Sequence, residues 1–328
     1  MATESAAQLT RRASTRKATT RKAQQVPQIT TLLAVLALLL AAGCGTTPPA
    51  GPGAQRNLAG SASADDLLAG AMRRQAVVQA LPLVQAAAEK SPDRVDIVWL
   101  HTQLCTQVAG CESAPLEARL RKLDPGNAAA WIGALARARA QRDTAAESEI
   151  LDAMGRSERF DLYWNTLVSR LAVAATRSAP DPGLGGRDPI TAGLNEAIGW
   201  LSGVAVPAFR SITDTCSAAR ATDPAIAARC LRLSETMLRG DTYIAEAVGL
   251  GIRERLATPG TPAATAVAEM IKISRYQHDT ATAIMESQLE RERFSRELLE
   301  LMRKLRREQE VYIAVIRWGG EPVLPPTG

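Results

Sequence analysis

The chain of 328 residues has 39 basic and 34 acidic side chains, which gives a formal net charge of +5. The whole excess lies in front of Cys44, because six basic residues and one acidic residue precede it and 33 of each kind follow. A body without net charge creates no field that would steer it toward phosphate backbones. We therefore expect no nucleic acid among the partners.

Hydrophobic residues make up 46% of the sequence, whereas aromatic residues make up only 4%. The length and the apolar content are sufficient for one large or two small domains with a buried core. Alanine, leucine and arginine are abundant, and these residues lose little free energy on entering a helix. The composition therefore predicts an all-α fold.

The N-terminal segment has the pattern of an export signal. Its apolar stretch covers 14 residues, 29–42, and is shorter than the roughly 20 residues that a membrane-spanning helix needs. Basic residues precede this stretch and small residues follow it, as in a signal peptide. We expect residues 1–43 to be a signal peptide, and an uncleaved anchor is the alternative.

The stretch Ala41-Ala42-Gly43-Cys44 resembles the lipobox of bacterial lipoproteins. This resemblance implies that the chain is cut before Cys44 and is held at a membrane by lipid on that residue. In the same family, Asp after the Cys retains the protein at the inner membrane. Gly45 therefore implies the outer membrane of the cell envelope, facing the periplasm; an ordinary signal peptide with a chance cysteine is the alternative. Residues 44–63, rich in small and turn-forming residues, are expected to form a flexible tether.

From residue 64 onward the sequence predicts one helix after another and no strand-like alternation. Turn-forming stretches such as "LDPGN" and "ATDP" separate the helices. A helical-repeat domain is expected over 64–257, and a long charged helix with a short tail over 258–328. The predicted helices cover 64–90, 93–108, 114–123, 127–141, 144–156, 160–177, 190–202, 205–221, 224–239, 241–257 and 262–317.

Tryptophans recur within similar stretches of sequence. Trp99, Trp131 and Trp164 are separated by 32 and 33 residues, and a weaker copy places Trp200 another 36 residues on. This pattern resembles the tetratricopeptide repeat, a helix–turn–helix unit, mainly over 92–160. The resemblance implies an array of α-α repeats that binds a protein or peptide in a groove formed by stacked units. An irregular helical bundle is the alternative.

The stretch from Thr261 to Arg317 contains neither Pro nor Gly, which predicts a single helix of 57 residues. An apolar stripe is expected to pack this helix along the repeats, and a projecting coiled-coil arm is the alternative. Residues 302–309, "MRKLRREQ", form a concentrated basic patch. A solvated helix end explains the patch, and contact with acidic lipid or wall polymer is the alternative. The stripe consists of Phe294, Leu298, Met302, Leu305, Tyr312 and Ile316.

Four cysteines follow Cys44, and an exported chain meets oxidising conditions that favour disulfides. Gly110 can turn the chain so that Cys111 returns toward Cys105. Cys216 and Cys230 flank the turn "ATDP". If the helices on either side of this turn form a hairpin, they would bring the two cysteines together. We therefore expect disulfides Cys105–Cys111 and Cys216–Cys230, and four buried free thiols are the alternative.

The sequence offers no clear constellation for catalysis or metal binding. His101 and Cys105 are four residues apart on one helix face, but no second pair completes the three or four ligands of a zinc site. Wall-cleaving lipoproteins use a single Glu, yet the Glu-Ser and Gly-Leu-Met-Gln motifs associated with them are absent. We expect no cofactor, no metal and no enzymatic activity.

These observations predict a non-catalytic, lipid-anchored envelope protein that binds a protein or peptide partner as a scaffold or assembly factor. One alternative is an inhibitor or immunity lipoprotein that neutralises a toxin in the periplasm. A cell-wall hydrolase is a further alternative, which the missing motifs disfavour.

Overall fold

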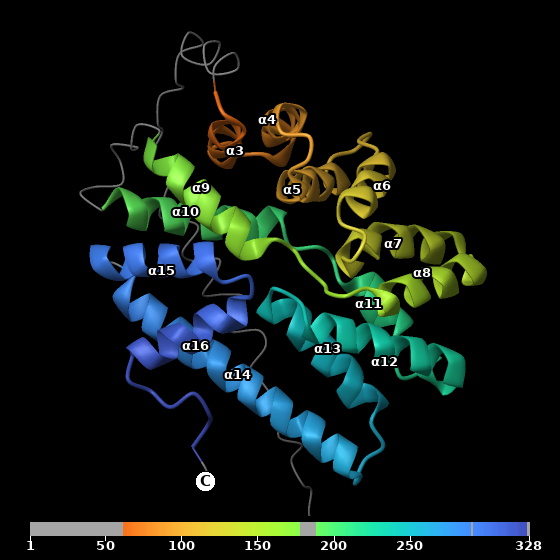
Figure 1. Ribbon diagram of the computed structural model, residues 1–328. Coiled ribbons are helices and arrows are strands. Elements are labelled where there is room, and N and C mark those ends of the chain that lie inside the picture. The colour runs from red at the N-terminus through yellow and green to blue at the C-terminus, as the bar shows by residue number, and fades with distance from the viewer. Residues whose placement is uncertain (1–61, 178–187, 290, 327–328) are drawn as a thin grey trace, which may run out of the picture. The chain divides into compact units, whose positions relative to one another are not determined.

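The computed structural model describes residues 62–177, 188–289 and 291–326, and Figure 1 shows their arrangement. These residues form fourteen α-helices, α3 to α16, and contain no β-strand. The predicted all-α class is therefore confirmed for the described part of the chain. The predicted signal peptide, Cys44 and all but the end of the tether lie outside the described residues. All described residues belong to one compact unit, Gly53–Gly328.

Most helix boundaries in the first half of the body follow the sequence signals, except that the predicted helix 64–90 is divided. The helices are α3 (Ala64–Met72), α4 (Val77–Lys90), α5 (Val95–Thr106), α6 (Ser113–Leu123), α7 (Ile132–Gln141), α8 (Thr144–Arg156) and α9 (Trp164–Arg177), with a 3-10 turn η1 (Ala128–Trp131) before α7. The second half contains α10 (Pro189–Val204), α11 (Arg210–Thr215), η3 (Arg220–Thr222), α12 (Pro224–Leu238), α13 (Tyr243–Leu256), α14 (Pro262–Gln288), α15 (Glu292–Lys304) and α16 (Glu308–Trp318).

Short polar residues fix several of the helix starts. The Asp223 carboxylate accepts a hydrogen bond from the Ala225 N–H and precedes Pro224 at the first position of α12. Thr261 caps α14 in the same way before Pro262. A side-chain acceptor satisfies an N–H group that has no partner within the helix, and Pro lacks that N–H. The stop signals read from the sequence therefore also mark helix starts.

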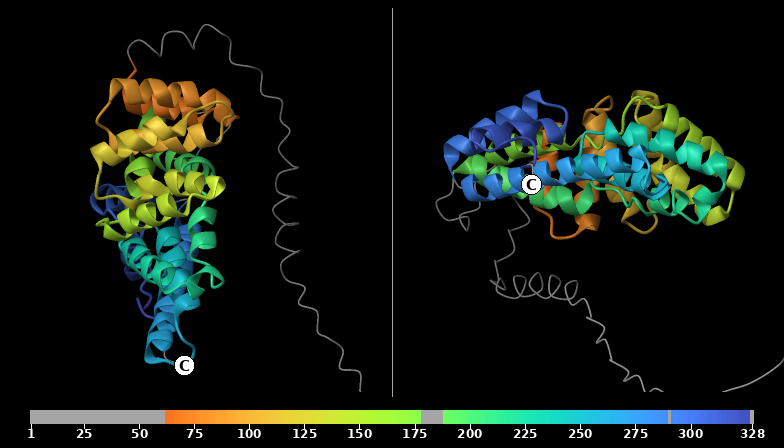
Figure 2. Two further views of the ribbon diagram at one scale, coloured as in Figure 1. Left: turned by 90° about the vertical axis from the view of Figure 1, so that its right-hand side faces the viewer. Right: turned by 90° about the horizontal axis from the view of Figure 1, so that it is seen from below.

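Helices that follow one another along the chain pack in pairs. The pairs are α3 with α4, α5 with α6, α7 with α8, α9 with α10, and α12 with α13. Figure 2 shows the helices stacked in successive layers. This paired packing is consistent with a helical-repeat array, and it buries a continuous apolar core that extends through the described helices.

Two predicted helices in the repeat domain are wrong in extent. The stretch 64–90 divides at residues 73–76, because the turn lets α3 pack on α9 while α4 packs on α5. The stretch 205–221 contains only the six-residue α11 and the turn η3. Pro207 disfavours helix at its start, and the regular part ends before Cys216, which is bonded to Cys230.

The single C-terminal helix predicted over 262–317 is also wrong, since the chain divides it into α14, α15 and α16. The breaks allow each short helix to bury its own part of the apolar stripe. Leu298 and Met302 are buried on α15, which packs on α9 and α10. Tyr312 and Ile316 are buried on α16, which packs on α14. Tertiary burial therefore outweighs the absence of Pro and Gly.

Both predicted disulfides are confirmed. Cys105 and Cys111 have Cα atoms 5.2 Å apart, and Cys216 and Cys230 have Cα atoms 5.6 Å apart. Two disulfides in one chain indicate an oxidising compartment outside the cytoplasm. No helix in the described ranges is both long enough and apolar enough to cross a membrane.

Candidate functional site: an arginine-lined groove

The four repeat tryptophans are packing residues. Trp99 lies within α5 and is 1% exposed, and Trp164, at the start of α9, is also buried. Trp131 ends η1 and lies beneath Arg121, whose guanidinium carbon is 4.5 Å from the ring centroid. Trp200, near the end of α10, packs partly buried against the core. None of the four forms an exposed aromatic binding surface.

The surface beside α5 and α7 is partly filled by the chain itself. The Gln107 side chain, at the end of α5, donates to the Val204 carbonyl oxygen at 3.1 Å. On α7, Arg139 donates to the Thr215 hydroxyl at 2.8 Å. The segment between α10 and α12 thus contacts the first helices of two successive pairs. A continuous peptide groove along these helices is therefore not open; a small hollow remains between them, and the larger open hollows lie elsewhere.

Two neighbouring hollows form a large open polar site, and we call them together the arginine groove. Their volumes are about 670 Å³ and 420 Å³, and both include the exposed Thr166 on α9. The first hollow lies where three connections meet, those before α9, α13 and α16. The second lies between α3, α9 and α15. The groove is lined by Asp65, Glu158, Arg159, Asp161, Tyr163, Thr166, Ser169, Arg170, Val173, Arg239, Asp241, Met302, Arg303, Arg306 and Arg307.

Asn127 holds the connection before α9 in an extended course. Its side-chain NH₂ donates to the Asp161 carbonyl oxygen, and its side-chain oxygen accepts from the Asp161 N–H, both at 2.9 Å. The connection ends at Tyr163, which has a left-handed backbone with φ of 58°. The Tyr163 hydroxyl donates to Asp124 at 2.7 Å. A non-glycine residue in this region is uncommon and is retained where its surroundings hold it firmly.

Asp241 joins the three connections that meet in the first hollow. Its buried carboxylate accepts from the N–H groups of Leu162 at 2.7 Å and Trp164 at 3.0 Å. Its backbone carbonyl accepts from the Glu308 N–H at 2.7 Å. Burial and the charge of nearby Asp161 raise the pKa of Asp241 to about 8. Asp241 is therefore largely uncharged at neutral pH.

The guanidinium groups in this hollow are held in place by main-chain oxygens. Arg239 donates to the Glu158 carbonyl at 2.8 Å, and Arg307 donates to the Gly240 carbonyl at 3.1 Å. Arg306 pairs with the Asp161 carboxylate and also donates to the Arg239 carbonyl. Each guanidinium has five N–H donors, so donors remain after these contacts. A ligand that uses them would not have to order the side chains first.

The charges of the groove set what it can bind. Six arginines and four carboxyl groups line it, and one of these carboxyl groups is the largely neutral Asp241. Asp124, Glu246 and Glu300 pair with three of the arginines from outside the lining. The region therefore has little net charge but many fixed guanidinium N–H donors. Such an arrangement suits directional hydrogen bonds to carboxylate or phosphate oxygens.

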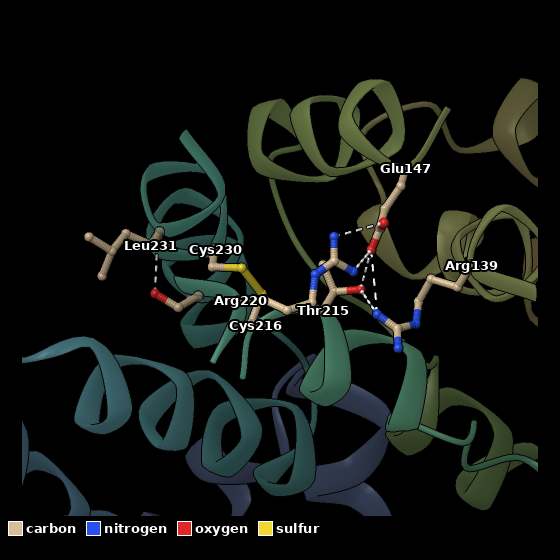
Figure 3. The surroundings of a disulfide bond; sticks show 8 residues. Arg139, Glu147, Thr215, Cys216, Arg220, Cys230 and Leu231 are labelled. Carbon is tan, nitrogen blue, oxygen red and sulfur yellow. Dashed lines mark hydrogen bonds and ion pairs between the residues drawn. A yellow bond between two sulfur atoms is a disulfide. The ribbon is translucent and has the colours of Figure 1, made fainter. Parts of the chain in front are cut away.

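Glu147 and Glu149, two acidic residues on α8, are in ordinary structural settings. Glu147 on α8 is buried and bound by Arg220, Thr215 and Arg139, as Figure 3 shows. Glu149 is exposed. In the parts of the chain that the structure describes, no group of three or more His, Cys, Asp or Glu residues could hold a metal ion.

The sequence contained one signal for this site. The basic patch at 302–309 supplies Arg303, Arg306 and Arg307. The contributions of Arg159, Arg170 and Arg239 depend on helix packing and were not recognisable in the sequence. No family model, curated protein or solved structure matches the chain.

Proposed function

We propose that this chain is a lipid-anchored scaffold of the cell envelope that binds an acidic segment of a protein partner in the arginine groove. The observation that carries the proposal is the set of fixed guanidinium groups around Thr166, which leave donors free in an open hollow. Paired arginine N–H groups match the two oxygens of a carboxylate. Acidic side chains of a partner are therefore the natural complement.

The length of the groove limits the segment that it can accept. Tyr163, directly before α9, lines the first hollow, and Val173, ten residues further on within α9, lines the second. This separation corresponds to about 15 Å at 1.5 Å per helical residue. An extended peptide advances by about 3.3 Å per residue, so roughly five residues fill this length. A short acidic stretch in a loop or terminus of the partner has the required size.

The proposed anchor is lipid attached to Cys44, with the following residues as a tether. The two disulfides support a location outside the cytoplasm. We propose the periplasmic face of the outer membrane, on the basis of the lipobox resemblance and Gly45. Replacing Cys44 by Ser should move the protein from the membrane fraction to the soluble fraction. A Cys44→Ser protein that stays in the membrane fraction would contradict the anchor.

Photo-crosslinking in cells tests partner binding. The full chain carries a photoreactive amino acid at Thr166, inside the groove, or at the exposed Glu149, outside it. The proposal predicts a discrete adduct with an envelope protein from position 166 and none from position 149. The crosslinked peptide should be acidic. The absence of an adduct at 166, or identical adducts at both positions, would contradict the proposal. An exported toxin as the crosslinked protein would favour the inhibitor alternative.

A further inference from the structure

A separate hollow lies between the α5–α6 pair and the α7–α8 pair. It has a volume of about 160 Å³ and is formed by α5, α6 and α7, with Pro207 and Ala208 closing one side. We call it the Trp99 pocket. It shares no lining residue with the arginine groove, so the inference drawn from it does not depend on the proposed function.

Small residues on η1 and α7 create the space. Ala129, Ala130, Gly133 and Ala136 present little or no side chain to the pocket. A dry cavity of about 150 Å³ is sufficient to hold benzene in another protein. The Trp99 pocket therefore has room for a ring or a group of similar size, which is about the size of one side chain or a small-molecule fragment.

Two polar groups of the lining have no hydrogen-bond partner among the described residues. The indole N–H of Trp99 is buried and has no acceptor. The side-chain amide of Gln103, a residue only 8% exposed, makes no hydrogen bond within the described ranges. Buried polar groups are normally paired, so the Trp99 N–H represents unused binding capacity. The Gln103 amide is not fully buried, and it is free to pair with a ligand in place of solvent. They offer an indole donor and an amide that can both donate and accept.

The other polar groups in the pocket are already satisfied. Thr102 donates to a main-chain oxygen of its own helix at 2.8 Å, and Thr106 does the same. Glu117 is held by Arg137 through two hydrogen bonds of 2.8 Å and 2.6 Å, and by Ser113 at 2.9 Å. An anionic ligand would meet the Glu117 carboxylate, and a cationic ligand would find that carboxylate already paired. The unpaired Trp99 N–H and Gln103 amide therefore suit a neutral ligand.

We propose that the Trp99 pocket binds a neutral carboxamide carried on a small apolar body. The carbonyl oxygen of the ligand supplies the acceptor that the Trp99 N–H lacks, and its amide N–H pairs with the Gln103 side chain. The apolar body lies against Leu120, Ile132 and the small residues of α7. The carboxamide can belong to a free molecule, such as an N-acetylated sugar, or to a side chain of a bound protein.

The test uses the ¹⁵N-labelled full chain in detergent and follows its five tryptophan indole signals by NMR during titration with benzamide. Trp99→Phe identifies the Trp99 signal. We expect benzamide to shift that signal selectively, with a Kd of millimolar order for a ligand of this size. Benzoate, which has the same shape but a negative charge, should not shift it. No selective shift with benzamide, or an equal shift with benzoate, would overturn the proposal.

Matched variants locate the binding. Ala136 lines the pocket mouth and is exposed on α7, so Ala136→Leu should block the pocket and abolish the shift without affecting the fold. Ala140→Leu makes the same change on α7 at an exposed position outside the lining and should bind like the wild type. Gln103→Leu should weaken benzamide about tenfold, the effect of one lost hydrogen bond. Wild-type binding by Ala136→Leu would overturn the proposal.

Titration with N-acetylglucosamine and with N-acetyl-asparagine amide separates the two sources of the carboxamide. A shift of the Trp99 signal by the sugar alone indicates a free saccharide ligand, and a shift by the amino-acid derivative alone indicates a side chain of a partner. Each of these outcomes supports the carboxamide class, because both probes contain a neutral amide. If benzamide binds and neither of the two does, an aromatic ring rather than the amide is recognised, and the proposed ligand class is wrong.

Discussion

Replacing Glu147 by Gln tests how the segment between α10 and α12 is held on the repeats. The Glu147 carboxylate accepts two hydrogen bonds from Arg220, at 2.6 Å and 3.0 Å, and one from the Thr215 hydroxyl at 2.8 Å. It also pairs with Arg139 at 3.4 Å. The substitution keeps the shape of the side chain but removes its charge. Arg220 and Arg139 would then both lose the Glu147 anion (Figure 3), and Arg139 would keep a pair with Asp214 at 3.5 Å.

The expected loss of stability follows from the burial of the partners. Removing one member of a fully buried ion pair costs about 3–5 kcal/mol. Here the side chains of Arg139 and Arg220 are 24% and 33% exposed, so water can partly solvate them. We therefore expect Glu147→Gln to lower the free energy of unfolding by about 2–3 kcal/mol.

Urea denaturation followed by circular dichroism at neutral pH, with the disulfides intact, measures this loss. Glu149→Gln is the matched control, because it makes the same change at an exposed position of the same helix and should cost no more than about 0.5 kcal/mol. Equal stability of the two variants would refute the reasoning.

The pH dependence provides an independent check. Burial would raise the pKa of Glu147, but hydrogen bonds from Arg220 and Thr215, together with the charge of Arg139, hold it below its usual value. A carboxyl group with a depressed pKa contributes stability above its unfolded pKa of about 4.3 and loses it as the pH falls through the folded pKa. The stability difference between wild type and Glu147→Gln should therefore be constant near neutrality and shrink in acid.

Three further predictions concern other parts of the structure. Replacing Cys216 and Cys230 together by Ala opens a loop with a sequence separation of 14 and should lower the free energy of unfolding by about 3 kcal/mol in urea denaturation. Gly133→Ala places a Cβ atom 2.2 Å from a Glu117 oxygen, so calorimetry should show that the free energy of unfolding falls by roughly 1–3 kcal/mol. Gly199→Ala places its Cβ atom in open space and should not lower the free energy of unfolding. The folded pKa of Asp241 is raised to about 8, so the free energy of unfolding of the wild type relative to Asp241→Asn should fall as the pH rises from 4 toward 8. A difference between the two proteins that does not change with pH would contradict the raised pKa.

Local signals in the sequence were sufficient for both disulfides and for most helices of the repeat region. Asp223-Pro224 and Thr261-Pro262 mark helix starts because capping and the missing proline N–H act within a few residues. The Cys216–Cys230 pair follows from its symmetric placement about one turn. These features depend on neighbours along the chain, which the sequence shows directly.

Features that depend on distant contacts were not predictable. The sequence between α14 and α15 and between α15 and α16 contains no Pro or Gly, and these are separate helices because α15 packs on α9 and α10 while α16 packs on α14. The arginine groove likewise combines Arg159, Arg239 and Arg306 from three separate connections. A basic patch was visible in the sequence, but its partners in space were not.

Charge reversal within the groove tests the account's central claim most directly. Arg170 and Arg303 have half-exposed side chains, and their ion-pair partners among the described residues are Asp65 and Glu300, respectively. The double substitution R170E/R303E should preserve the fold and reduce the affinity of the full chain for its crosslinked partner at least about tenfold. The control R210E/R293E reverses two arginines outside the groove, 89% and 91% exposed, and should bind like the wild type. Equal affinity of the two double variants would contradict binding in the arginine groove.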